Sequence, residues 1–377
     1  MSNSMVREGA SKKRVLTGMS GGVDSSVTAA LLLQAGFDVA GATLKLFEPA
    51  DAAEDAEGRP CTSNAEDARA VCARLGIAHH VLDFQDTFRA NVMERFAQSY
   101  RRGLTPNPCV DCNRSVKFPM LLRAADELGC DFIATGHYAR IEFDEQSGRY
   151  LLRRAADRNK DQSYVLYTLT QEMLSRTLLP LGAYTKPQVR QEAESRGFQN
   201  AQRPESQDIC FIPEGDYGAF LEAEMGVSPQ PGDILDMEGN VLGRHRGVIH
   251  HTIGQRRGLG LALPGKRYVV DKNAVQKTVT IGEERALYRN VFRVQDLNLI
   301  SIRDLTGPVA AAVMTRYRDR ETPCVLEPIE GGALVRLAEP KRAVTPGQSA
   351  VFYIGDTVLG GGIIGDLDEF GKNGQEK

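Results

Sequence analysis

Short apolar runs alternate with helix-like segments throughout the first 210 residues, and this alternation limits the fold more than any other feature of the sequence. RVLTGM is followed by a Gly-rich turn and by SSVTAALLLQAG, and the pattern returns in FDVAGATLKLF, HHVLDF and CDFIAT. Successive parallel strands need a crossover helix between them. The pattern therefore predicts an α/β domain over residues 1–210, built on a doubly wound parallel sheet.

The texture changes after residue 210. Residues 211–283 contain short alternating runs broken by Gly, Pro and Asp-Lys-Asn turns, which predicts a small β domain. A second β-rich segment follows over residues 284–370, with strands expected in AAVMTRYR, ALVRLA and SAVFYI. The last residues, 371–377, are predicted to be a disordered tail.

Composition limits the compartment and the partners. No apolar run near the N-terminus is long enough to span a bilayer or to form a secretory signal, so we expect a cytoplasmic protein without a membrane partner. The 7 cysteines are an odd number and thinly spread, which disfavours a disulfide framework, so any disulfide bond is expected to be transient and catalytic. A net charge of −3 gives no sign of a polyanionic partner. Nucleic-acid binding would have to come from local basic clusters, such as Arg244, Arg246, Arg256 and Arg257 or RYRDR at 316–320.

The segment GMSGGVDSS, residues 18–26, follows the first predicted strand and opens the first predicted helix. Its backbone N–H groups and the helix N-terminus can converge on a phosphate, although the segment lacks the lysine of a P-loop. The SGGxDS pattern resembles the pyrophosphate loop of ATP-pyrophosphatase enzymes, in which Asp24 would hold Mg²⁺ and Ser20, Ser25 and Ser26 would donate to phosphate. The alternative is a tight turn with a Ser/Asp cap.

Three cysteines stand in polar settings. Cys109 and Cys112 lie in TPNPCVDC, and Cys210 lies in RPESQDICFIP. Cys72 and Cys130 fall in helical or helix-ending patterns and are predicted to be core residues. His137 follows the strand CDFIAT beside Gly136, and it is either a structural hydrogen-bonding residue or a catalytic group.

Taken together and in order, GMSGGVDSS, TPNPxxxCN, ATGHYAR, KDQSY, ICFI, HHTIGQRRGLG, TRYRD and TPGQSAVFY resemble the tRNA-specific 2-thiouridylases. The resemblance implies an ATP-pyrophosphatase domain, a small central β domain and a C-terminal β-barrel that together hold tRNA. The implied reaction replaces the C2 oxygen of the wobble uridine by sulfur in tRNAs for Lys, Glu and Gln. ATP first adenylates that oxygen, which is otherwise a poor leaving group.

The resemblance also implies residue roles. Cys210 would carry a persulfide and Cys112 would be its nucleophilic partner. Contacts to ATP would come from Gly18, Met19, Ser20, Gly21, Gly22, Val23, Asp24, Ser25, Leu44 and Gly136. The target base would meet Asn107, Pro108 and Cys109, and tRNA would be held by His137, Lys160, Asp161, Gln162, Arg316, Tyr317 and Gln348.

Cys109 departs from the family pattern, because many relatives have an aspartate there that is assigned an acid/base role. A thiol does not replace a carboxylate base readily, and Asp111 would point the other way in an extended segment. Two mechanisms stay open at this point. Either Cys112 and Cys210 act without metal through a transient disulfide, or Cys109, Cys112 and Cys210 bind a [4Fe-4S] cluster with one open iron.

Two other function classes compete with thiolation. One is another pyrophosphatase-loop ligase, such as an amidating synthetase, for which paired cysteines at this spacing would not be expected. The other is an RNA-binding module in which the cysteines hold a structural metal, against which the intact SGGVDSS argues. The sequence leaves open whether a cysteine desulfurase or a sulfur-relay protein donates the sulfur, and it leaves the oligomeric state open.

Overall fold

The structure is a computed structural model that describes residues 12–47, 63–202, 209–212 and 215–365. The chain divides into two compact units. The first contains residues 1–88, 113–163 and 169–207, and the second contains residues 89–112, 164–168 and 208–377. Within the described ranges, no helix is long and apolar enough to cross a membrane. Cys61 and the predicted tail 371–377 lie outside the described residues.

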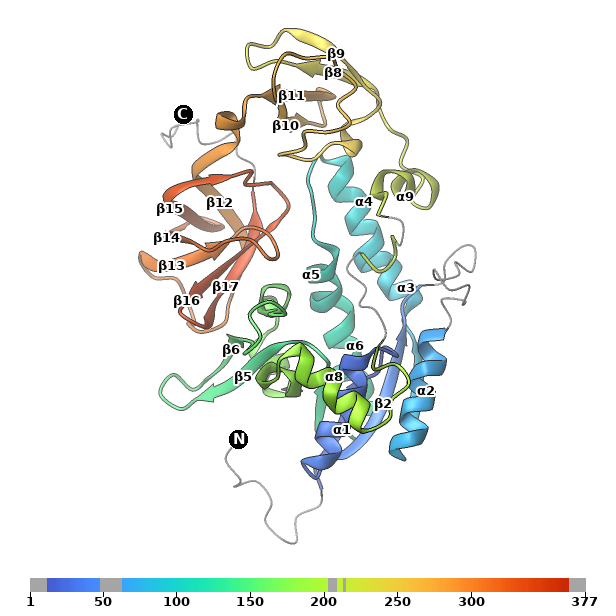
Figure 1. Ribbon diagram of the computed structural model, residues 1–377. Coiled ribbons are helices and arrows are strands. Elements are labelled where there is room, and N and C mark those ends of the chain that lie inside the picture. The colour runs from blue at the N-terminus through green and yellow to red at the C-terminus, as the bar shows by residue number, and fades with distance from the viewer. Residues whose placement is uncertain (1–11, 48–62, 203–208, 213–214, 366–377) are drawn as a thin grey trace. The chain divides into compact units, whose positions relative to one another are not determined.

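A five-stranded parallel sheet forms the centre of the first unit, as the sequence predicted (Figure 1). Its strands follow the order β3-β2-β1-β4-β7, so the chain moves outward in one direction from β1 and later in the other. The carboxyl end of β1 is therefore the point where the winding reverses, which is where such sheets bind ligands. The strands are β1 Arg14–Gly18, β2 Asp38–Lys45, β3 His79–Asp83, β4 Phe132–Ala134 and β7 Thr177–Leu178.

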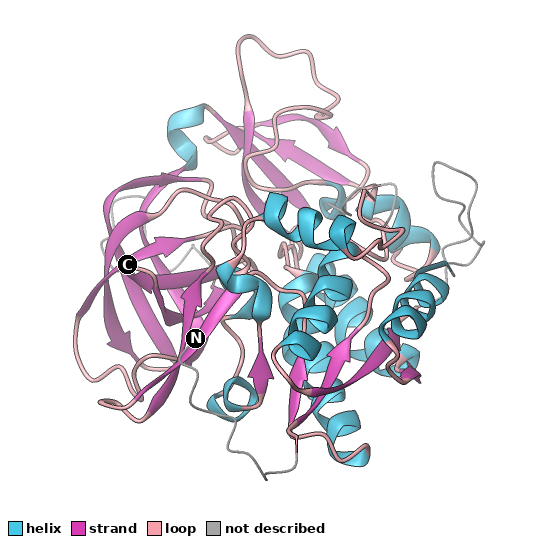
Figure 2. Cartoon of the chain, turned by 60° about the horizontal axis from the view of Figure 1, so that its bottom comes forward, coloured by secondary structure: helices cyan, strands magenta, loops and turns pink. Residues whose placement is uncertain are grey.

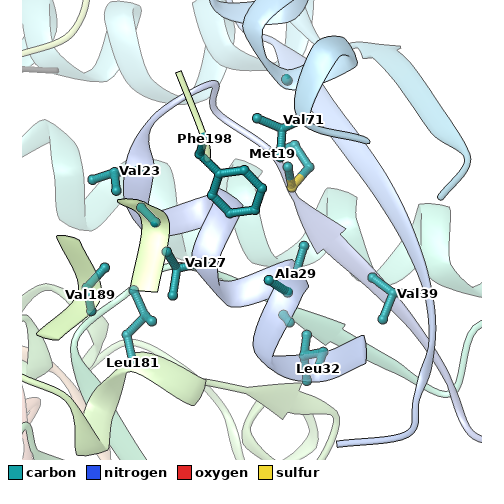
Figure 3. Close-up of a cluster of buried hydrophobic side chains, with 14 of the residues drawn as sticks. Met19, Val23, Val27, Ala29, Leu32, Val39, Val71, Leu181, Val189 and Phe198 are labelled. Carbon is teal, nitrogen blue, oxygen red and sulfur yellow. The ribbon is translucent and has the colours of Figure 1, made fainter. Parts of the chain in front are cut away.

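Helices accompany these strands, whereas the later part of the chain consists mostly of strands and loops (Figure 2). Buried side chains of α1 pack with Leu181, with Val189 of α8 and with Phe198 (Figure 3). This packing holds the start of α1, and the loop before it, in place. The helices of this unit are α1 Val23–Gln34, α2 Ser63–Leu75, α3 Gln85–Phe88, α6 Phe118–Glu127, α7 Gln171–Ser175 and α8 Lys186–Ser195.

The first unit also contains an antiparallel hairpin that the sequence reading missed. Strands β5 Ala139–Asp144 and β6 Arg149–Arg154 pair through six residues each. The turn is closed by Asp144, whose carboxylate accepts hydrogen bonds from the backbone N–H and hydroxyl of Ser147. An Asp followed by a Gly-containing turn between two alternating runs was the available signal.

The second unit contains a four-stranded sheet and a barrel. The sheet has the order β10-β11-β8-β9 and buries Ile234, Val269, Val279 and Ile281 against one another. Its strands are β8 Gly232–Leu235, β9 Val241–His245, β10 Tyr268–Asn273 and β11 Thr278–Gly282.

Six antiparallel strands close into the barrel, because β12 pairs with both β15 and β17. Its interior holds Phe292, Val335, Phe352 and Leu359. The strand predicted over AAVMTRYR ends at Met314, so the arginines that follow lie in a turn. The barrel strands are β12 Tyr288–Leu299, β13 Val309–Met314, β14 Thr322–Ile329, β15 Gly332–Arg342, β16 Ser349–Ile354 and β17 Thr357–Ile364.

Helices α4 Glu94–Arg101, α5 Pro108–Cys112 and α9 Tyr217–Ala223 complete the second unit. Phe96 and Tyr100 of α4 form an aromatic cluster with residues on and before α9. The Phe96 ring lies 6.4 Å from Phe220, and the Tyr100 ring stacks on Tyr217 at 5.0 Å. This cluster fixes α4 within the second unit.

Candidate active site

The pyrophosphate-type loop lies at the winding reversal, between β1 and α1 of the first unit. Gly21 has φ of +76°, a left-handed conformation that favours glycine, and Gly22 is the N-cap of α1. The loop is tied to β2, since the N–H of Met19 donates to Ala42 and the hydroxyl of Thr43 donates back to the Met19 carbonyl, each at 2.8 Å. The fold thus presents the start of α1 at the edge where a phosphate would bind.

The serines of the loop are arranged by short-range hydrogen bonds. The Ser25 and Ser26 hydroxyls each donate to the Gly22 carbonyl at 3.0 Å, and both side chains are buried. Ser20 is exposed, and its N–H donates to the Ser25 hydroxyl at 3.2 Å. Ser20 is therefore the serine whose side chain is already open to a ligand, whereas Ser25 and Ser26 fix the turn.

Asp24 is held by a lysine and a tyrosine. The ammonium of Lys186 lies 2.8 Å from Oδ1 and 2.9 Å from Oδ2 of Asp24, and the Tyr138 hydroxyl donates to Oδ1 at 2.7 Å. The Lys186 side chain is only 8% exposed, against 30% for Asp24. The loop that lacks a lysine in its own sequence therefore has one beside it, supplied by the first turn of α8.

Two further residues tighten this arrangement. Gly136 approaches so closely that a Cβ added there would lie 3.0 Å from the backbone of Asp24 and Ser25, which explains a glycine at that position. The Asn200 amide donates to the Gly21 carbonyl at 2.7 Å and to the Ser26 hydroxyl at 3.0 Å. Gly136 therefore lies directly against the loop.

The other residues expected near ATP divide into two kinds. Met19 and Val23 are 2% and 4% exposed and belong to the hydrophobic core, so only their backbone groups can face a ligand (Figure 3). Leu44 is half-buried near the carboxyl end of β2, and Gly18 is the last residue of β1.

Helix α5 carries the CxxC pair of the second unit. Asn107 caps it, because its side-chain Oδ1 accepts the N–H of Cys109 at 3.2 Å, and Pro108 occupies the first helical position. Cys109 is exposed and Cys112 is buried. Since the segment is helical, Cys109 and Asp111 project about 200° apart around the axis, so Asp111 does not take the place of the aspartate that Cys109 replaces.

Helix α4 contacts the sequence neighbours of Cys112 and Cys210 through two adjacent residues. Arg95 lies 3.6 Å from Oδ1 of Asp111, the neighbour of Cys112. Phe96 meets Phe211, the neighbour of Cys210, edge to face at a centroid distance of 5.7 Å. Phe211 is buried whereas Cys210 is exposed, so the chain is anchored beside Cys210 while the thiol faces solvent. One helix therefore sets the neighbourhoods of Cys112 and Cys210.

The three cysteines do not gather into a metal-ligand set. Across the described residues, no group of three or more His, Cys, Asp or Glu side chains is arranged to hold a metal ion. Cys109 and Cys112 occupy different environments on α5, and Cys210 lies on a separate turn. The described cysteines also form no disulfide with one another. The described residues therefore give no support to an iron–sulfur cluster on Cys109, Cys112 and Cys210. The expected core positions of Cys72 and Cys130 are confirmed.

The hydrogen bonds of the Asp24 carboxylate also disfavour the binding of magnesium there. Both carboxylate oxygens already accept hydrogen bonds from Lys186, and one also accepts from Tyr138. A metal ion at Oδ1 would have to displace a donor, and one at Oδ2 would lie beside the Lys186 ammonium, which repels a cation. The residues present fit Asp24 as the partner of Lys186 and do not fit it as a preformed metal ligand.

The residues expected to hold tRNA lie in structural networks. His137 is 9% exposed, its Nδ1 lies 2.8 Å from the Thr135 hydroxyl, and burial keeps its pKa well below the usual value. Asp161 accepts hydrogen bonds from the Ser163 hydroxyl at 2.7 Å and from the backbone of Ala155, and Lys160 is half-buried beside it. Gln162 accepts the N–H of Tyr138 at 2.9 Å, and Tyr138 in turn contacts Asp24.

In the second unit, Arg316 donates to the carbonyls of Ile253 and Ala343 and to the Thr345 hydroxyl, and burial lowers its pKa from the ordinary value. Tyr317 is half-buried, with its ring 6.0 Å from that of Tyr164. The Gln348 side chain donates to the backbone of the segment that leads into α5.

Sequence reasoning missed Lys186 and Asn200. Lys186 is the first residue of α8, where a positive charge is unfavourable to the helix dipole. It follows the N-cap Thr185, whose backbone N–H donates to the Gln188 side chain in a capping box. A lysine at such a position was a signal that a carboxylate or a phosphate lies nearby. Asn200 had no comparable signal, because it lies in an irregular segment after α8.

A loop of this kind at the winding reversal of a parallel sheet is typical of nucleotide-binding α/β domains. The family model described as the tRNA methyl transferase HUP domain matches residues 13–214. The tRNA methyl transferase PRC-barrel domain matches residues 218–283, and the aminomethyltransferase beta-barrel domain matches residues 273–364.

Curated relatives identify the family within this class. A tRNA-specific 2-thiouridylase MnmA from Acetivibrio thermocellus is 48% identical over 94% of this chain and 99% of its own length. Enzymes of the same name from Heliobacterium modesticaldum and Pelotomaculum thermopropionicum are 49% and 46% identical, each over 95% of this chain and over 94% and 99% of their own lengths. The chain belongs to the tRNA-specific 2-thiouridylase family.

Proposed function

We propose that this protein catalyses the ATP-dependent 2-thiolation of the wobble uridine in tRNAs for Lys, Glu and Gln. One combination of features in a chain of this family carries the proposal. A phosphate-type loop lies at the winding reversal, and the sequence neighbours of two cysteines contact α4. A ligase of another kind has no use for the cysteines, and an RNA-binding module has no use for the loop.

In the first step the uridine O2 attacks the α-phosphorus of ATP. An O–P bond forms, the bond between the α- and β-phosphates breaks, and pyrophosphate leaves. The negative charge that develops on pyrophosphate is stabilised by backbone N–H groups at the start of α1 and by the exposed hydroxyl of Ser20. ATP brings its own Mg²⁺ as part of the substrate.

Lys186 supplies the cation that the loop sequence lacks. Its ammonium is already located at the loop by Asp24 and Tyr138, so little reorganisation is needed when phosphate arrives. Asp24 then acts through Lys186, which it positions. This role replaces the direct Mg²⁺ contact that the sequence suggested, because the lysine already holds both carboxylate oxygens.

In the second step the terminal sulfur of a Cys210 persulfide attacks C2 of the adenylated uridine. The C–S bond forms and the C2–O bond breaks, releasing AMP with the former uridine oxygen. Cys112 attacks the Cys210 sulfur, so a Cys112–Cys210 disulfide forms while the transferred sulfur takes the electron pair of the persulfide bond. An external thiol reductant then restores both thiols. The proposed disulfide is therefore transient.

Cys109 has no metal-binding role in this proposal. Its exposed side chain lies on the capped first turn of α5, where Asn107 and Pro108 set the backbone. We assign these three residues to the approach of the target base. The sulfur is delivered by a cysteine desulfurase or by a sulfur-relay protein that can reach the exposed Cys210. The reaction takes place in the cytoplasm, where its tRNA substrates are found.

Reconstitution tests the function. Purified protein, Mg-ATP, a cysteine desulfurase, cysteine and an unmodified tRNA-Glu transcript should yield 2-thiouridine, detected by nucleoside mass spectrometry, together with AMP. A transcript with cytidine at the wobble position is the matched control and should give neither product. Absence of 2-thiouridine with a persulfidated, ATP-binding protein would contradict the proposal.

A further inference from the structure

The segment that leads into α5 is held by the C-terminal barrel. The Gln348 amide nitrogen donates to the carbonyls of Thr105 at 2.9 Å and Pro106 at 3.2 Å. The N–H of Thr105 donates to the Pro346 carbonyl at 3.0 Å. Three hydrogen bonds therefore connect two consecutive residues before the cap of α5 to one barrel loop.

The two segments are also in close backbone contact. Gly347 has φ of +89°, and a Cβ there would lie 2.9 Å from the Cβ of Leu104 and from the backbone nitrogen of Thr105. A backbone nitrogen cannot move aside as a flexible side chain does. The barrel loop is therefore shaped to accept this segment, and glycine is required for both conformation and space.

The barrel loop is itself rigid. Gln348 donates its backbone N–H to Thr345, and its carbonyl accepts the N–H of Ile364 at 2.8 Å. Arg316 donates to the hydroxyl of Thr345 at 2.8 Å, and that hydroxyl donates to Ala343. The backbone of Gln348 is thus fixed within the barrel, and its side chain alone reaches the segment before α5.

The four-stranded sheet of the second unit also contacts the segment before α5, through Lys272 of β10. The Lys272 ammonium donates to the His251 carbonyl at 2.9 Å and lies 3.5 Å from the Thr105 hydroxyl. It also lies over the Tyr100 ring of α4 at 6.0 Å. Gly103 has φ of +79°, and a Cβ added there would lie 3.4 Å from the Cβ of Ala274. The Lys272–Thr105 contact is longer than either hydrogen bond from the Gln348 amide, so Gln348 makes the stronger connection to this segment.

We propose that Gln348 is a positioning residue for the reaction. Its amide fixes the Thr105 and Pro106 carbonyls, the next residue Asn107 caps α5, and α5 ends in Cys112. The barrel thereby sets the orientation of the thiol that resolves the persulfide. This inference rests on the proposed role of Cys112, and the amide contact with the α5 segment is distinct from any contact with RNA.

The test uses full-length protein without tRNA or ATP, so that it does not depend on thiolation. Gln348→Met keeps the length of the side chain and removes the amide. We expect faster hydrogen exchange at residues 104–112 and roughly tenfold faster alkylation of Cys112, the effect of losing about one net hydrogen bond. Gln295→Met, exposed on β12 of the same barrel, is the matched control and should change neither.

Activity provides a second readout. Gln348→Met should lower kcat while the KM for ATP stays unchanged, because the ATP loop belongs to the other unit. Unchanged exchange and alkylation in Gln348→Met would overturn the proposal even if the enzyme thiolates tRNA normally. If exchange rises throughout the barrel, the Gln348→Asn variant is measured instead, because it retains the amide on a side chain shorter by one methylene. Loss of protection confined to residues 104–107 in that variant supports the proposal. Full protection of those residues refutes it.

Discussion

Removing Asp24 should lower the free energy of unfolding more than removing Lys186, because the two partners of this ion pair differ in burial. Asp24→Ala leaves an ammonium whose side chain is 8% exposed without its carboxylate, and stranding a buried charge typically costs about 3–5 kcal/mol. Lys186→Met leaves a carboxylate that is 30% exposed and still accepts the Tyr138 hydroxyl. Losing the charge-assisted pairing with the ammonium there costs about 1.5–3 kcal/mol. Asp24→Ala should therefore be the more destabilising change, by roughly 1–2 kcal/mol.

Hydrogen exchange of α1 and α8 amides measures these free energies without assuming that two units unfold together. Asp38→Ala is the matched control, since the Arg14–Asp38 pair is 47% and 56% exposed and should contribute at most about 1 kcal/mol. The double variant should cost less than the sum of the single ones. If Lys186→Met costs as much as Asp24→Ala, or if both match the control, the reasoning from burial is wrong.

Two other properties can be predicted. Burial keeps the pKa of His137 well below its usual value, so the unfolded chain takes up a proton that the folded one does not, and stability is lost as pH falls below about 6.5. His137→Gln should remove up to about 2 kcal/mol of the loss between pH 7.5 and 5, measured by urea unfolding, whereas an identical pH dependence would contradict a neutral His137. The exposed Arg256 and Arg257 are expected to contact tRNA phosphates, so Arg256→Ala with Arg257→Ala should lower the slope of log K against log salt by about 2. An unchanged slope would exclude them from the RNA interface.

The sheet could be predicted because its strands and helices alternate with regular spacing, and the loop because its glycines and serines follow β1 directly. The hairpin β5–β6 was not recognised, since its strands are short and lie within a domain read as parallel. Side-chain roles were harder to predict. Lys186 lies 162 residues from Asp24, and Gln348 lies 243 residues from Thr105, so no local pattern reports either contact.

The cysteines illustrate the same limit. A CxxC pair with a third cysteine suited either a cluster or a persulfide route, because spacing alone does not say which thiols converge. The structure separates the environments of Cys109 and Cys112 on a capped helix and anchors the neighbours of Cys112 and Cys210 on α4. That information comes from Arg95 and Phe96, which carry no motif.

The central claim is that ATP activates the C2 oxygen of the target uridine. A tRNA transcript carrying ¹⁸O at O2 of the wobble uridine should be incubated with the persulfidated protein and Mg-ATP, and the released AMP should be analysed by mass spectrometry. The account predicts one ¹⁸O atom in AMP for each 2-thiouridine formed. Formation of 2-thiouridine with unlabelled AMP, and the ¹⁸O recovered in water, would contradict it.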